Sequence, residues 1–192
     1  MGSQSSLTRE NSLNSHYVLD HGDGHGAHQW NQNTALWREE IRIPMIVAAP
    51  GQSAHVDDTH LVSNGLDLLP TVADYADVEA PEGLDGLSLR PLVESACETA
   101  WREQVVVETQ INFGSGPGGP PYARALVSEQ NKYSVFAMGR YREQLIDLAA
   151  DPGEMVNLAV ETKHGETLGR CRDQLRAWCE RTNDPAIRII PD

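Results

Sequence analysis

Lysine is scarce in this sequence. Lys132 and Lys163 are the only two, and all other basic residues are arginines. Asp and Glu total 28 against 15 Lys and Arg, which gives a formal net charge of -13. Nucleic acids and anionic membranes require a concentrated positive surface, so this balance argues against both as partners. An acidic, lysine-poor composition is also typical of cytoplasmic proteins adapted to salt.

Cysteines and long apolar runs are equally sparse. The three cysteines, Cys97, Cys171 and Cys179, are odd in number and lack paired metal spacing, which argues against a disulfide framework. On one helix, Cys171 and Cys179 would lie about 12 Å apart, too far for a disulfide. No apolar run approaches the roughly 20 residues of a membrane helix, and residues 1–15 lack the apolar core of a secretory signal. We therefore expect a disordered leader at 1–15, reduced thiols and a cytoplasmic location.

The rest of the chain alternates apolar segments with turns, and 40% of the residues are hydrophobic. Residues 16–95 are expected to form an α/β domain with buried strands at 16–19 and 42–49, the second of them parallel. A helix capped by Asp67 follows, with Pro70 in its first turn.

Residues 100–192 are expected to form a smaller antiparallel sheet with a C-terminal helix. The predicted strands are 105–109, 123–128, 133–137 and 144–148. The apolar face of the helix consists of Leu168, Cys171, Leu175 and Trp178.

A loop rich in glycine and histidine follows the first predicted strand. Five of its side chains can bind metal: Asp20, His21, Asp23, His25 and His28. Open α/β sheets bind ligands at such strand ends, and mixed carboxylate and imidazole ligands suit calcium, magnesium or manganese. Spacing alone is equally consistent with a solvent-exposed loop, because aspartate is common in turns.

Four ordered motifs in this chain resemble those of the sulfatase family. The first begins with DHGD at 20–23 and is similar to DHGDxxGxH…K…Y-E-E-x-x-R-x-P. It continues through Gly26, His28, Thr34, Trp37, Glu39, Arg42 and Pro44. The second and third, DLLPT at 67–71 and LDGLSL at 84–89, resemble D-L-x-P-T and L-D-G-x-S-L. The fourth, at 144–158, resembles E-L-Y-D-L-x-x-D-P-x-E-x-x-N-L.

The resemblance implies an alkaline-phosphatase-like α/β fold. In that fold the C-terminal part completes a large mixed sheet and adds a small antiparallel sheet packed by a C-terminal helix. The family hydrolyses sulfate esters with a formylglycine formed from a C/S-x-P-S-R motif, while a divalent metal, here expected to be calcium rather than magnesium or manganese, polarises the sulfate. By position, Asp20 and His21 are implied metal ligands and Asp23 supports the loop. His28 is implied either to donate to a sulfate or leaving-group oxygen or to fix the loop.

Two departures from the family pattern bear on activity. These 192 residues contain no C/S-x-P-S-R motif, so formylglycine is not encoded in them. Asn33 stands where the family usually has a substrate-binding lysine, and an amide lacks the ammonium charge, which predicts weaker anion binding. We expect the C-terminal part of a truncated sulfuric ester hydrolase, inactive alone, that acts on sulfate esters only when it is completed.

Two alternatives remain open at the level of sequence. One is a non-catalytic binding or oligomerisation module that self-associates through an exposed sheet edge. The other is a hydrolase of phosphate or phosphonate esters, because the wider superfamily shares the metal site.

Overall fold

The computed structural model describes residues 14–16, 27–29, 35–95, 100–110 and 121–192. The chain divides into two compact units. The first lies within residues 1–20 and 44–102, and the second within 21–43 and 103–192. The segment 21–43 therefore groups with the C-terminal residues, although the sequence between it and residue 103 belongs to the first unit. None of the helices in the described parts of the chain is long and apolar enough to cross a membrane.

A small two-stranded sheet opens the first unit. Strand β1 (Asn14–His16) pairs antiparallel with β2 (Ile46–Ala48), and Ser15 lies opposite Val47. The expectation of a buried parallel strand over 42–49 is wrong on both counts, because β2 is antiparallel and Ile46 is half exposed. An apolar run does not specify the direction of its partner strand, which tertiary pairing decides.

Helix α2 (Asn64–Tyr75) is the main helix of this unit, and α3 (Arg90–Ser95) follows it. Its N-cap is Ser63, so the prediction that Asp67 caps the helix is wrong. Asp67 lies inside the first turn, where its carboxylate accepts a hydrogen bond of 2.8 Å from the Ser63 backbone N–H. This bond extends the helix by one turn towards the N-terminus and places Pro70 in the second turn.

The second and third sequence motifs bind each other within this unit. Asp67 is fully buried, accepts a hydrogen bond of 2.8 Å from the Leu87 backbone N–H, and forms a two-point ion pair with Arg102. The Thr71 hydroxyl accepts from the Leu89 N–H at 2.8 Å. The residues that define these motifs therefore hold the 84–89 loop on α2.

A proline and a glycine explain how closely this loop approaches the helix. Pro70 has no N–H to donate to the Leu66 carbonyl, so that oxygen lacks its usual helical partner. Gly86 lies directly against it, and a Cβ on Gly86 would stand 1.9 Å from the Leu66 oxygen. The proline of one motif thus leaves the space that the glycine of the other requires.

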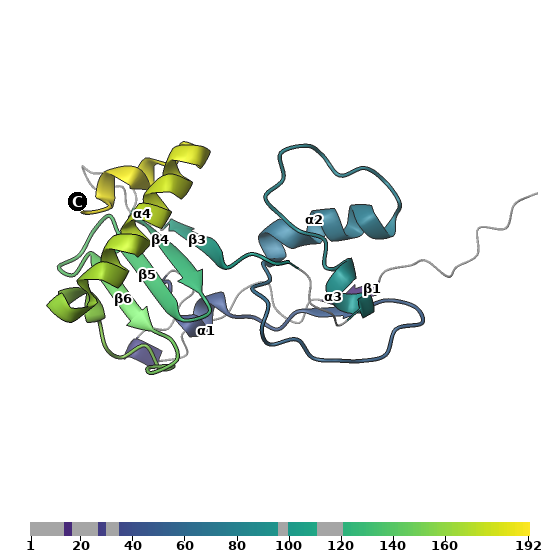
Figure 1. Ribbon diagram of the computed structural model, residues 1–192, viewed down its shortest axis with the longest axis horizontal. Helices are drawn as coiled ribbons and strands as arrows, with labels where there is room; N and C mark the ends of the chain where they lie inside the picture. The colour runs from purple at the N-terminus through teal and green to yellow at the C-terminus, as the bar shows by residue number, and fades with distance from the viewer. Residues whose placement is uncertain (1–13, 17–26, 30–34, 96–99, 111–120) are drawn as a thin grey trace, which may run out of the picture. The chain divides into compact units, whose positions relative to one another are not determined.

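The second unit contains a four-stranded antiparallel sheet with strands in chain order (Figure 1). They are β3 (Gln104–Gln110), β4 (Tyr122–Ser128), β5 (Asn131–Phe136) and β6 (Glu143–Asp147). All four predicted strands are confirmed to within two residues at each end. Alternating side chains on β4 and β5 supply apolar surface to both faces, so the sheet needs cover on both.

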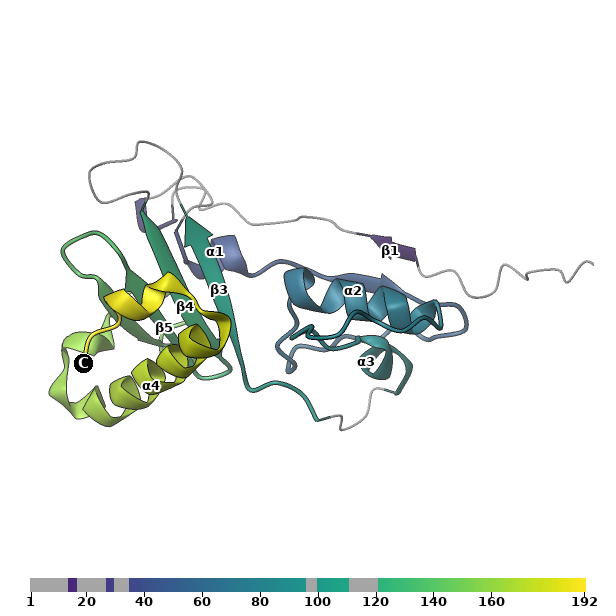
Figure 2. The ribbon, with the colours of Figure 1, turned by 90° about the horizontal axis from the view of Figure 1, so that it is seen from above.

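Helix α4 (Gly165–Thr182) covers one face, and α1 (Arg38–Ile41) lies at the other (Figure 2). The core under α4 includes Leu126, Tyr133, Leu145, Leu168, Cys171, Leu175 and Cys179. The predicted helix face is confirmed except at its end, where Cys179 is buried and Trp178 only partly so. The opposite core is smaller and joins Leu36 to Ala123 and Ala125. Four short 3-10 turns complete the described elements: η2 (Ala27–Gln29), η3 (Leu158–Val160), η4 (Thr162–His164) and η5 (Pro185–Ile189).

The fourth sequence motif shapes the turns after β6. The Asp147 carboxylate accepts from the backbone N–H groups of Ala149 and Ala150. The Asn157 side chain donates to the Glu143 carbonyl and accepts from Leu145 N–H at 3.0 Å, and it also caps η3. These bonds return the chain alongside β6. The predicted α/β class, with a small antiparallel sheet and a C-terminal helix, is confirmed.

Candidate functional site

His28 is the one predicted site residue that the structure describes. Asp20, His21 and Asn33 lie outside the described residues, as do Asp23 and His25. Within the described ranges, no group of three or more His, Cys, Asp or Glu side chains could hold a metal ion. The predicted metal ligands therefore remain sequence-based expectations, whereas the surroundings of His28 can be built from the residues upward.

His28 lies in η2 with a left-handed backbone, at φ 52° and ψ 22°. Its ring stacks on the indole of Trp37, with centroids 3.9 Å apart and planes 4° from parallel. The Nε2 atom lies 3.9 Å from the Glu39 carboxylate, and the imidazole side chain is only 10% exposed. The ring is thus held in one plane with a carboxylate at its edge, an arrangement that fixes the directions in which its nitrogens can donate or accept.

Trp37 is in turn flanked by the two ends of a buried ion pair. Lys132 Nζ donates to the Leu36 carbonyl at 2.5 Å and bonds to the Glu154 carboxylate, and the same ammonium lies 5.2 Å from the centre of the Trp37 ring. The Glu154 carboxylate also accepts from the Arg38 backbone N–H at 3.0 Å. The pair therefore bonds to the backbone immediately before and immediately after Trp37.

Both members of this pair are almost entirely removed from solvent. Lys132 is 1% exposed and Glu154 is 3% exposed. Burial lowers the pKa of Lys132, and the adjacent Glu154 carboxylate opposes that shift because it favours the charged ammonium. The negative groups of Glu39 and Glu40 act in the same direction as Glu154.

Glu154 also has an unusual backbone. Its φ of 55° lies in the left-handed region, which residues with a Cβ rarely adopt. The hydrogen bond from its own N–H to the Asp151 carbonyl, at 3.0 Å, closes this tight turn. The turn directs the side chain into the sheet face that α1 covers.

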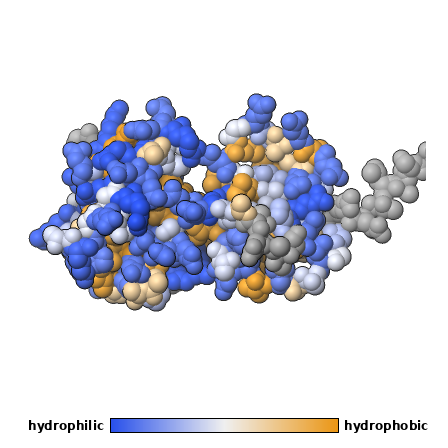
Figure 3. Space-filling model, viewed as in Figure 1, coloured by the Kyte–Doolittle hydropathy of each residue, from blue (hydrophilic) through white to orange (hydrophobic). Residues whose placement is uncertain are grey.

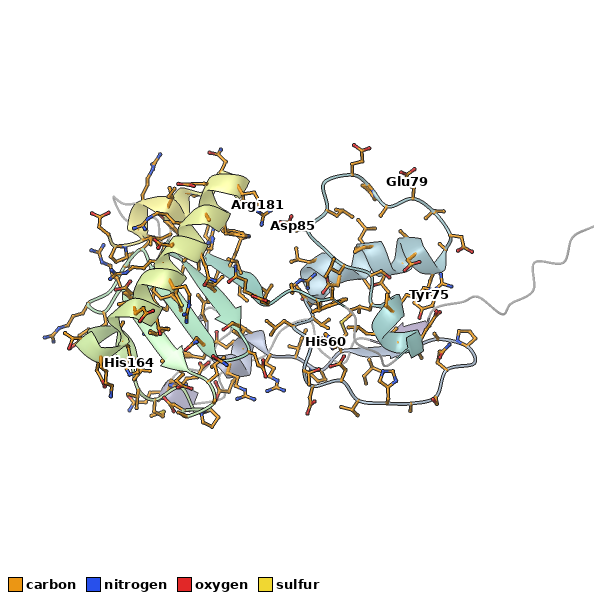
Figure 4. The ribbon with its side chains drawn as sticks, in the orientation of Figure 1. His60, Tyr75, Glu79, Asp85, His164 and Arg181 are labelled. Carbon is orange, nitrogen blue, oxygen red and sulfur yellow. The ribbon has the colours of Figure 1, made fainter. Side chains whose placement is uncertain are left out.

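A second polar cluster lies in the first unit, around His60 (Figure 4). Asp57 accepts from the His60 ring at 2.6 Å and from the backbone N–H groups of Thr59 and His60. Burial alone would raise the pKa of Asp57, but these hydrogen bonds outweigh it and lower the pKa to about 2. His60 also meets the Trp101 ring edge-on. All these bonds are local to one turn, and we assign the cluster a structural role.

Sequence reasoning overlooked Trp37 as the neighbour of His28 and Lys132 as the neighbour of Trp37. One signal was available, because Lys132 is one of two lysines in the chain and immediately precedes the predicted strand 133–137. Its partner Glu154 was visible only as a member of the fourth motif. Nothing in the spacing indicates that residues 132 and 154 meet beside residue 37, since the sheet and the turn after β6 bring them together.

Comparison with known proteins adds the family. The sequence model described as "N-sulphoglucosamine sulphohydrolase, C-terminal" matches residues 26–181. The chain is 31% identical over 172 residues to the Delta 4,5-hexuronate-2-O-sulfatase of Bacteroides thetaiotaomicron, covering 87% of this chain and 34% of that protein. The chain spans about a third of the length of the curated relatives it matches.

Solved structures share the fold as well. A 2-O GAG sulfatase superposes with a TM-score of 0.81 at 27% identity, over 93% of this chain and 38% of that one. A phosphonate monoester hydrolase from Silicibacter pomeroyi superposes with a TM-score of 0.71, also at 27% identity, over 88% of this chain and 35% of that one. The fold, the ordered motifs and the family match agree: this chain belongs to the sulfatase family and corresponds to its C-terminal portion.

Proposed function

We propose that this chain supplies part of the divalent-metal and sulfate site of a sulfuric ester hydrolase and is inactive by itself. The observation that carries the proposal is the family match over residues 26–181, which includes His28 and all but the start of the first motif. The nucleophile and the other metal ligands would come from protein outside these 192 residues.

The donor set of this chain fits a partial metal site. Asp20 offers a carboxylate and His21 an imidazole, which suit a divalent cation. Calcium takes six to eight oxygen ligands, so two side chains do not complete its coordination. A bound metal would polarise the sulfate oxygens. His28 would present a donor to a sulfate or leaving-group oxygen, and Asn33 would contact the anion without a charge.

The surface of α2 supports the idea that further protein completes the site. Its exposed side includes three apolar residues, Leu66, Leu69 and Val72, which are 37%, 52% and 44% exposed, whereas the polar Asp67 and Thr71 are buried. Apolar residues appear among hydrophilic ones on the surface of this unit (Figure 3). Neighbouring exposed apolar side chains are typical of surfaces that other protein covers.

Metal binding tests the half-site directly. Isothermal titration of the chain with calcium, magnesium and manganese should show a weak site that prefers calcium and is lost in Asp20→Ala. Asp173→Asn is the matched control, because Asp173 is an exposed acid on α4 with its side chain 80% exposed. Equal binding by wild type and Asp20→Ala would refute the assigned ligand.

An activity assay tests the claim of inactivity. The purified chain should show no turnover of an aryl sulfate above background, with or without calcium. Turnover by this chain alone would contradict the proposal. If the chain shows no turnover and binds no metal, the non-catalytic module is favoured instead. A dimer in light scattering would then favour self-association through a sheet edge.

A phosphonate ester is the second candidate substrate. It is favoured by the likeness to the phosphonate monoester hydrolase, which matches at the same 27% identity as the 2-O GAG sulfatase. Once a completing portion is identified, the two reactions can be separated by comparing kcat/KM for an aryl sulfate and an aryl phosphonate monoester. Faster turnover of the phosphonate would replace the sulfatase assignment.

A further inference from the structure

We propose that the buried Lys132–Glu154 pair is a clamp that positions the His28 ring through Trp37. The inference rests on the proposed function in one respect, since it gives His28 a task at the sulfate site. Lys132 and Glu154 are positioning residues, because neither touches the imidazole. The contacts that carry the proposal are a continuous series from the centre of the small sheet to the His28 ring.

The first step concerns the backbone groups that the two charged side chains bind. Lys132 reaches the Leu36 carbonyl and Glu154 reaches the Arg38 N–H, so the two charges bond to opposite sides of a single residue, Trp37. Trp37 is the N-cap of α1 and makes no side-chain capping hydrogen bond of its own. The Glu154 carboxylate takes over this role at the first helical N–H. Tertiary bonds therefore fix the backbone on both sides of Trp37, in addition to the helical bonds that the Trp37 carbonyl accepts within α1.

The second step is the transfer of this position to the imidazole. The Trp37 ring has the Lys132 ammonium 5.2 Å from its centre and the His28 ring stacked at 3.9 Å. Stacked rings restrict each other to offset parallel planes. Any rotation of the indole therefore requires the imidazole to move as well.

The third step is the choice of residues. A buried ion pair is often no more stabilising than an apolar pair of similar volume, because both charges lose their hydration. Apolar side chains, however, could not bond to the Leu36 carbonyl and the Arg38 N–H. The charged side chains are thus explained by the hydrogen bonds that they form with the backbone on either side of Trp37. The left-handed backbone at Glu154 is energetically unfavourable, and it orients this carboxylate towards Lys132 and the Arg38 N–H.

Proton NMR of the full chain tests the clamp. A ring stacked on an indole experiences its ring current, so the His28 ring protons should be shifted upfield of those of an ordinary histidine. His28→Gln identifies these signals, and Trp37→Leu should abolish the shift. Glu154→Gln and Lys132→Met should each remove most of it while the signals of the other histidines stay in place.

Glu143→Gln is the matched control. Glu143 belongs to a partly buried ion pair of the same sheet, with Arg172, but on the face covered by α4. This variant should lose stability and keep the His28 shift. A shift that survives both clamp variants would overturn the proposal, and so would a shift that disappears equally in Glu143→Gln.

If Lys132→Met and Glu154→Gln both unfold, Glu154→Asp carries the same test, because its shorter carboxylate retreats from the Arg38 N–H and should reduce the shift. The chemical shift reports the clamp in the chain alone and needs no catalysis. Failure of the sulfatase assignment would therefore leave a positive result standing, and failure of the clamp would leave metal binding by Asp20 unaffected.

Discussion

Asp67 is a fully buried carboxylate with its bonding capacity directed at three partners: the N–H groups of Ser63 and Leu87 and the guanidinium of Arg102. A single atom change at such a position leaves a buried charge unpaired. In the sulfatase motif D-L-x-P-T this aspartate thus organises the first unit.

Asp67→Asn should destabilise the chain severely. Removing one partner of a buried ion pair typically costs about 3–5 kcal/mol, because the remaining guanidinium is left without its counter-charge. The free energy of unfolding, measured by urea denaturation with circular dichroism, should fall by that amount. Asp77→Asn should change it little, since Asp77 is 81% exposed and lies 3.9 Å from Arg90. Equal effects of the two variants would contradict this account.

Two thiols provide a second test at this scale. Cys171 and Cys179 are buried and free, and burial raises the pKa of both, that of Cys179 to about 11 with help from the negative Asp184. Because the thiolate is the reactive form, both should resist iodoacetamide at pH 8 in the folded chain and react rapidly in urea. Peptide mass spectrometry separates the sites. Native labelling of either at the rate of a small free thiol would refute the burial described here.

At the scale of elements, α2 and the 84–89 loop depend on one close approach. Gly86→Ala would place a Cβ 1.9 Å from the Leu66 carbonyl oxygen, a backbone atom that cannot rotate away. Overpacking of this kind typically costs about 1–3 kcal/mol. The expected result is a lower urea midpoint with an unchanged slope.

Gly65→Ala is the matched control within α2. A Cβ there would meet nothing within 4 Å, so the change should stabilise the helix by about 0.5–1 kcal/mol through its higher helix propensity. If both substitutions had the same sign, the close approach of the loop would not be the reason for glycine at 86.

The elements also show where sequence patterns succeed. The four strands of the small sheet were predicted to within two residues at each end, because turns interrupt the short apolar runs. The buried face of α4 was predicted except at its last position, because its apolar residues recur with the period of a helix. The start of α2 and the direction of β2 were not. A carboxylate reaching back to Ser63 decides the first, and pairing with a distant strand decides the second.

At the scale of the whole molecule, acid should unfold the chain in part through Glu143. Burial would raise its pKa, but hydrogen bonds from Arg172 and Tyr133 win and lower it below the ordinary value of 4.5. A carboxylate whose folded pKa is depressed contributes stability above its unfolded pKa and loses it as the pH falls through the folded value. The melting temperature should therefore decline below about pH 4.5.

The variant Glu143→Gln isolates this contribution. It should melt at a lower temperature than wild type at pH 7 and lose less on acidification, so the two curves should converge towards pH 3. Melting by circular dichroism between pH 7 and pH 3 makes the comparison. Parallel curves would show that the Glu143–Arg172 pair does not govern acid stability.

The sequence alone determined the family of this protein, its motif order, its small sheet and its terminal helix, because these follow from local periodicity and from residue types that tolerate few substitutes. It also indicated His28. Only the tertiary structure decided what surrounds that histidine, because Lys132, Glu154 and Trp37 are far apart in the chain and meet through strand pairing and the turn after β6. The tertiary structure also decided the contact of Asp67 with Leu87 and that of Gly86 with Leu66, since sequence spacing does not reveal which residues of a loop meet a helix.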